Sequence, residues 1–173
     1  MMMQALSAGG MPVLSDNQRV ADEDNPRGYM ELERAKTIAH DTSWLPHAQG
    51  RAVKLVSPLL RHLPPTYEYR IIFMQRDLTE ILASQQAMLR RRGAQAGKND
   101  ATLARAFERH LAAVASWIAA QANVEVLYVN YRDVLSDPAT QLARVPAFLG
   151  RDLALDAMVS VVDERLHGQR SGQ

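Results

Sequence analysis

The chain has 173 residues, 47% of them hydrophobic, which is long enough for one domain, residues 1–173, to bury most of its apolar surface. Its 20 basic and 19 acidic residues give a formal net charge of +1, so composition provides no broad attraction to nucleic acid or to an anionic membrane, and neither is expected as a partner. The chain has no cysteine, which excludes disulfides, thiolate metal ligands and cysteine nucleophiles, and we expect a cytoplasmic protein.

The N-terminal region is predicted to begin with a helix. Residues 1–8 end at two glycines, and residues 11–14 can form a short strand. There is no basic leader, and the longest apolar stretch, residues 111–120, has about half the length that spans a bilayer, so we expect no signal peptide and no transmembrane helix. Residues 15–28 are predicted to form a polar loop, and such loops are candidates for function.

The rest of the chain alternates apolar runs with helical patterns. Three apolar runs bounded by polar residues or proline predict buried strands: residues 51–57, 70–75 and 124–131. Helical patterns and caps predict the remaining elements: residues 31–40, 77–92, 100–118, 136–150 and 155–164. Strands separated by helices imply an α/β protein with a parallel sheet and right-handed crossovers.

Two of the predicted helices carry clear end signals. In the first, Asp100 can cap a helix whose apolar residues recur every three or four positions and should pack on the sheet: Leu103, Phe107, Leu111, Val114 and Ile118. In the second, Asp137 is the cap, Pro138 takes the first helical position and Gly150 ends the helix. Pro146 lies inside this second helix and should kink it.

A candidate anion site follows the strand at residues 70–75. Ligands of open α/β sheets collect outside the carboxyl ends of the strands, where Arg76 stands. Asp77 with Glu80 resembles a capping box, which would place Ser84 about two turns into the next helix on the same face. A phosphate could lie between the guanidinium and the hydroxyl. The alternative is an ordinary surface ion pair, a helix cap and a solvated serine.

The segment Ile71–Asp77, followed by Ser84, resembles the 3′-phosphate-binding element of P-loop sulfotransferases. In that family a strand-end arginine and a helix serine eight residues later bind the 3′-phosphate of the sulfate donor. The resemblance therefore implies that Arg76 and Ser84 bind this phosphate in the present chain.

Two later segments are similar to the same family. Val126–Leu135 is similar to its strand and the turn of tyrosine, acid and aspartate, and Ala147–Gly150 is similar to its closing helix. All of the similar segments together cover most of residues 51–150. Arg132 stands where the family commonly has an acid, and Pro146 is unusual in the closing helix, so the chain resembles a divergent bacterial branch.

The resemblance implies a P-loop nucleotide-binding α/β fold with helices flanking the sheet. It also implies transfer of a sulfuryl group from 3′-phosphoadenosine 5′-phosphosulfate to a hydroxyl or amine on a small molecule, a glycan or a peptide. The predicted catalytic bases are Glu31 and Glu23, because the polar loop should cross the mouth of the site. Alternatively, Glu31 is a first-turn glutamate favoured by the helix dipole. Lys54 can assist the leaving group or extend from its strand toward solvent.

One signature of that family is absent from the sequence. The family's first strand leads into a loop of the type Gly-x-Pro-Arg-Ser-Gly-Thr that cradles the 5′-phosphosulfate, and no such run occurs here. We therefore expect an N-terminally truncated sulfotransferase-like fold with an unpaired sheet edge and some tendency to self-associate. The chain is then either an enzyme of this class or a non-catalytic remnant that binds a nucleotide or a partner.

Two other functions are disfavoured by sequence. A different nucleotide-dependent phosphotransferase would need a Walker lysine motif, which is absent. A metal site is not expected, because the histidines show no ligand spacing: His40, His47, His62, His110 and His167.

Overall fold

A computed structural model describes residues 1–16, 18, 28–77 and 100–162 of the chain. Within these residues the elements follow in the order α1 (Met2–Ala8), the 3-10 helix η1 (Glu33–Thr37), α2 (Leu45–Ala48), the 3-10 helix η2 (Ser57–His62), β1 (Tyr69–Gln75), α4 (Asp100–Ala119), β2 (Val124–Asn130), α5 (Tyr131–Ser136), α6 (Pro138–Leu149) and α7 (Leu155–Ser160). Helices combined with a small parallel sheet make this an α/β fold, as the sequence predicts.

The sheet consists of β1 and β2, which pair in parallel over their full length. The register runs from Tyr69 opposite Val124 to Gln75 opposite Asn130. Apolar runs that are buried on both faces suit parallel strands, which explains why both were recognisable in the sequence. Because the strands are parallel, both carboxyl ends lie at one edge of the sheet.

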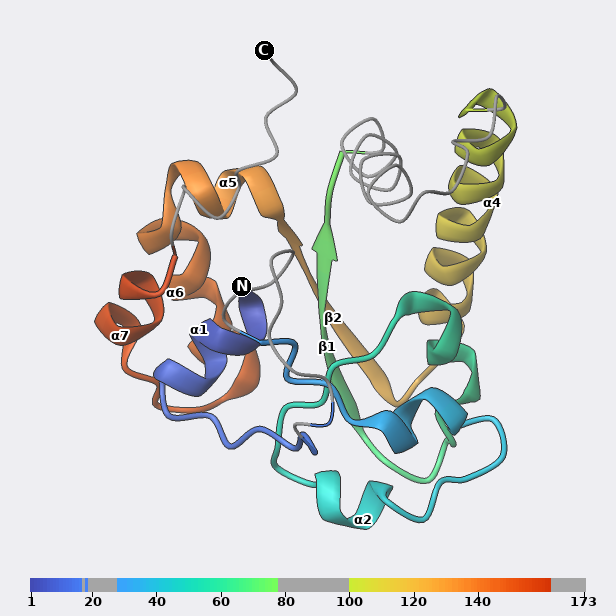
Figure 1. Ribbon diagram of the computed structural model, residues 1–173, viewed down its shortest axis with the longest axis horizontal. Helices are drawn as coiled ribbons and strands as arrows, with labels where there is room; N and C mark the ends of the chain where they lie inside the picture. The colour runs from blue at the N-terminus through green and yellow to red at the C-terminus, as the bar shows by residue number, and fades with distance from the viewer. Residues whose placement is uncertain (17, 19–27, 78–99, 163–173) are drawn as a thin grey trace.

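Helices cover both faces of the sheet (Figure 1). On one face α1, α5, α6 and α7 pack against a set of strand residues: Ile72, Met74, Leu127 and Val129. On the other face α4 and η2 pack against the alternate set: Ile71, Phe73, Val124 and Val126. Val129 is fully buried and the other strand residues of both sets are partly buried, so burial of apolar surface on both faces holds the strands between the two layers.

The helix α6 has the predicted ends. Asp137 accepts a hydrogen bond from the amide of Thr140 at 3.1 Å, and Pro138 follows at the first helical position. Gly150 ends the helix with φ of 61°, a conformation that favours glycine. The guanidinium of Arg70 donates to the carbonyl of Leu149, so β1 also satisfies the carboxyl end of this helix.

Several predicted elements differ from the structure. The strand expected at residues 51–57 is wrong: only Ala52 forms a bridge, to Val13, and η2 begins at residue 57. A strand needs a neighbouring strand with which to form backbone hydrogen bonds. Among the described residues, only Val13 forms a bridge to this segment. The helix expected at residues 31–40 is the five-residue η1.

The apolar face of α4 packs on the sheet only in its second half. Val114 and Ile118 are buried, whereas Leu103 is 47% exposed. The helix predicted at residues 77–92 and the loop at 93–99 lie almost entirely outside the described residues. The same is true of the chain beyond residue 162.

We predict that Asp137→Ala lowers the free energy of unfolding by about 1 kcal/mol, because it removes the side-chain acceptor at the start of α6. Urea unfolding followed by circular dichroism measures the change. Asp152→Ala is the matched control, since this exposed carboxylate makes no hydrogen bond to the described residues and its loss should change stability by less than about 0.5 kcal/mol. Equal effects of the two substitutions would contradict the cap.

A second prediction concerns acid stability. Asp41 accepts hydrogen bonds from the hydroxyl of Ser43 at 2.6 Å and its amide at 2.9 Å, and it pairs with Arg34 at 3.0 Å. These contacts, the Ser43 hydroxyl first, lower the pKa of Asp41 from 3.8 to about 2. Because the folded pKa is depressed, the stabilisation is present above about pH 4 and is lost as pH falls from about 4 to about 2.

Urea midpoints measured across this pH range test the prediction. Asp41→Asn should flatten the pH dependence between pH 4 and 2, whereas the control Asp152→Asn should leave it unchanged. A wild-type curve that Asp41→Asn does not alter would show that the carboxylate is not paired in solution.

Candidate functional site

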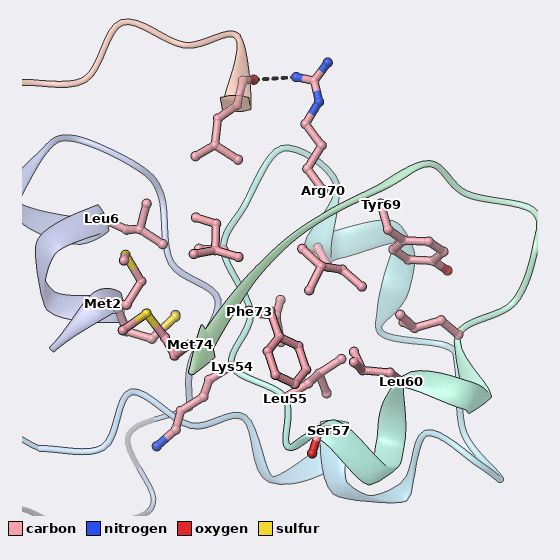
Figure 2. Close-up of a pocket in the computed structure, with 18 of the residues that line it drawn as sticks. Met2, Leu6, Lys54, Leu55, Ser57, Leu60, Tyr69, Arg70, Phe73 and Met74 are labelled. Carbon is pink, nitrogen blue, oxygen red and sulfur yellow. Dashed lines mark hydrogen bonds between the residues drawn. The ribbon is translucent and has the colours of Figure 1, made fainter. Parts of the chain in front are cut away.

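A groove of about 1350 Å³ runs along β1. Its walls include β1 itself, the segment of residues 49–55 and the N-terminal methionines. Figure 2 shows Met2, Leu6 and Met74 on one side of the strand and Leu55 and Leu60 on the other. The groove reaches the carboxyl end of β1, where Arg76 and Tyr131 line it.

Arg76 lies on the aromatic ring of Tyr131. Its guanidinium carbon is 4.3 Å from the ring centroid, and Tyr131 is the first residue of α5, directly after β2. The parallel register brings the two together, because the residues that follow both strands meet at the same edge. Such a cation–π contact at an exposed site contributes about 0.5–1 kcal/mol and fixes the plane of the guanidinium. The Arg76 side chain remains exposed at the groove.

Asn130 completes this edge. Its side-chain oxygen accepts hydrogen bonds from the amides of Arg132 at 2.8 Å and Asp133 at 3.4 Å. The start of α5 is therefore capped by its own chain, which occupies the amides of Arg132 and Asp133. Arg76 presents an exposed guanidinium at this part of the sheet edge.

Glu31 is held by two lysines. Its Oε1 lies 2.9 Å from the ammonium of Lys54, its Oε2 lies 3.5 Å from that of Lys36, and its side chain is only 14% exposed. Lys36 also pairs with Glu33, and that hydrogen bond is the main cause that raises the pKa of Lys36. Each oxygen of the Glu31 carboxylate therefore lies next to a lysine ammonium.

Lys54 connects this cluster to the groove. Its ammonium also contacts the carbonyl of Tyr29 at 3.4 Å and lies 5.6 Å from the centroid of the Tyr29 ring, and both residues line the groove. Lys54 and Arg76 therefore open onto the same groove. Ser84 and Glu23, in contrast, lie outside the described residues, so the convergence of Ser84 with Arg76 stays a prediction.

Residues 22–154 match the model of the Sulfotransferase family. The chain belongs to the sulfotransferase family. No curated protein and no solved structure matches the chain. The matched range includes all of the site residues predicted from sequence: Glu23, Glu31, Arg76 and Ser84. It also covers the sheet and the whole of α6, so the family match and the edge that carries Arg76 coincide.

Two contacts of this family member were not predicted from the sequence. Tyr131 was recognised only as part of a motif, although an aromatic residue directly after a strand could have indicated a partner for Arg76. Ser57 and the Nε2 of His110 lie 2.8 Å apart and join η2 to α4, and no local signal connects residues 53 positions apart. Among the residues that the structure describes, no three acidic or histidine side chains gather as a metal site, and no helix has the length and apolarity to cross a membrane.

We predict that Glu31 and Lys54 stabilise the fold as a pair. A double-mutant cycle with Glu31→Gln and Lys54→Met should give a coupling of about 0.5–1 kcal/mol that decreases as salt is added. Urea unfolding of the four proteins measures it. The exposed pair Arg70 and Glu125, 3.5 Å apart with side chains 48% and 68% exposed, is the control and should give a smaller coupling. A coupling energy of zero between Glu31 and Lys54 would contradict an ion pair between these two side chains in solution.

Proposed function

We propose that this sulfotransferase binds 3′-phosphoadenosine 5′-phosphosulfate with its 3′-phosphate on Arg76 and transfers the sulfuryl group to a hydroxyl or amine of a small-molecule acceptor. One observation carries the proposal: an exposed guanidinium stands at the carboxyl edge of two parallel strands and opens onto a large groove. Ligands of open α/β sheets bind at this edge.

The chemistry of Arg76 suits a phosphate monoester. Guanidinium is always charged and presents its N–H groups in a planar fork that matches phosphate oxygens. With one face against Tyr131, the N–H groups around the rim remain directed outward for a ligand. Ser84, eight residues along the chain, is the second proposed ligand, with its hydroxyl donating to the same phosphate.

The proposed transfer is an in-line displacement. The acceptor oxygen or nitrogen forms a bond to sulfur, and the bond between sulfur and the 5′-phosphate oxygen breaks, which releases 3′,5′-adenosine diphosphate. The acceptor proton passes to a carboxylate, for which Glu31 and Glu23 are the candidates. Release of Lys54 from Glu31 would free one carboxylate oxygen and also supply a cation for the charge that develops on the leaving phosphate.

Binding without transfer is the second candidate function. It needs only the exposed guanidinium of Arg76, because a phosphate can bind there whether or not a sulfuryl group is transferred. The two functions separate cleanly: both require the Arg76 contact, and only the enzyme converts the donor and a phenol acceptor to 3′,5′-adenosine diphosphate and a sulfate ester.

Calorimetric titration with 3′,5′-adenosine diphosphate tests the shared step. A hydrogen bond to a charged group is worth about 1.5–3 kcal/mol, so Arg76→Ala should weaken binding about 10- to 100-fold. Arg105→Ala, which removes an exposed arginine of α4, is the matched control and should leave the affinity unchanged. Adenosine 5′-monophosphate lacks the 3′-phosphate, so its affinity should not depend on Arg76. Equal affinities of the wild type and Arg76→Ala for 3′,5′-adenosine diphosphate would refute the site.

A further inference from the structure

Ser57 and His110 lie next to each other, and neither takes part in the proposed sulfuryl transfer. The hydroxyl oxygen of Ser57 is 2.8 Å from Nε2 of His110. Ser57 is the first residue of η2 (Figure 2), and His110 belongs to α4, 53 positions later. A hydroxyl this close to an imidazole has the geometry of a nucleophile with its base, for which about 2.6–3.2 Å is typical.

Core packing fixes the separation of the two side chains. Leu60, three residues after Ser57, and Val114, four residues after His110, belong to one buried apolar cluster and are 6% and 9% exposed. Since three residues make one turn of a 3-10 helix and about four make one turn of an α-helix, this cluster lies one turn along both elements from the polar contact. The distance between hydroxyl and imidazole therefore does not depend on their hydrogen bond alone.

The imidazole of His110 is also restrained from its own helix. Phe107, one turn earlier in α4, meets it edge to face, with ring centroids 6.3 Å apart and ring planes inclined by 66°. This contact limits rotation of the imidazole while Nε2 lies toward Ser57. Neutral imidazole carries its proton on one nitrogen, so the tautomer with the proton on Nδ1 leaves Nε2 to accept the serine proton.

The hydroxyl of Ser57 is not engaged at the start of its helix. Serines near helix starts commonly bond to a backbone amide of the first turn, but η2 follows Val56 and begins without a side-chain cap. Within the part of the chain that the structure describes, the Ser57 hydroxyl contacts His110 instead. Both residues are half-buried, so the pair is not sealed in the core.

We propose that Ser57 is a nucleophile, with His110 as its base, that accepts an acyl group from an activated carboxylic ester. This reaction does not depend on the nucleotide site. The serine oxygen bonds to the carbonyl carbon, and the bond from that carbon to the ester oxygen breaks. The serine proton passes to Nε2 of His110 and then to the departing oxygen, so the products are an O-acylserine and an alcohol or phenol. Because Leu60 and Phe107 are apolar neighbours of the pair, the acyl group should be uncharged.

Incubation of the full chain with p-nitrophenyl acetate tests the proposal. The wild type should release about one p-nitrophenolate per chain in a rapid first phase, and tandem mass spectrometry should find an acetyl group on Ser57. Ser57→Ala should remove both signals. His110→Gln cannot act as a base, so the first phase should slow about 100-fold. The controls Ser136→Ala and His40→Gln change an exposed serine and an exposed histidine and should leave the first phase unchanged.

A second readout uses the absence of cysteine from the chain. The thiol of Ser57→Cys is the only one present, so alkylation by iodoacetamide reports its reactivity directly. The thiolate is the reactive form, and a neighbouring imidazole favours it. Alkylation of Ser57→Cys should therefore be at least about tenfold faster than alkylation of the double variant Ser57→Cys with His110→Gln.

A purely structural contact gives different results. If the pair only joins η2 to α4, the substitutions lower the urea midpoint and leave the chemistry unchanged. An unaltered first phase in Ser57→Ala, equal rates for the wild type and His110→Gln, or equal alkylation of the two thiol variants would overturn the proposal. The wild-type mass measurement needs no variant, and acetyl groups on lysines without one on Ser57 would overturn it as well.

Discussion

The parallel pairing of β1 with β2 is the constraint on which the rest of the structure depends. Seven consecutive pairs fix the register, and that register assigns alternate side chains to the α1 side and to the α4 side of the sheet. It also brings both carboxyl ends to one edge, where Arg76 meets Tyr131. A slip of one residue would reverse the faces of a strand and separate these two side chains. The packing of the core and the geometry of the candidate site therefore have one origin.

The parts of the fold that sequence predicted are those with local causes. β1 and β2 were recognisable as apolar runs, and α6 by its cap at Asp137, its proline and Gly150. The position of Arg76 followed from the end of its strand. Pairing between distant segments left no such signal: residues 51–57 read as a strand but form one bridge, and the Glu31 contact with Lys54 spans 23 positions. The missing strand and the ion pair both depend on which distant residues lie next to these positions in the folded protein.

A crystal structure of the protein with 3′,5′-adenosine diphosphate tests the central claim most directly, because it locates the phosphate that the sheet edge is proposed to hold. The account predicts the 3′-phosphate within hydrogen-bonding distance of the Arg76 guanidinium and the Ser84 hydroxyl, with the guanidinium still against Tyr131. A nucleotide bound away from the carboxyl ends of β1 and β2, or a 3′-phosphate without contact to Arg76, would contradict it.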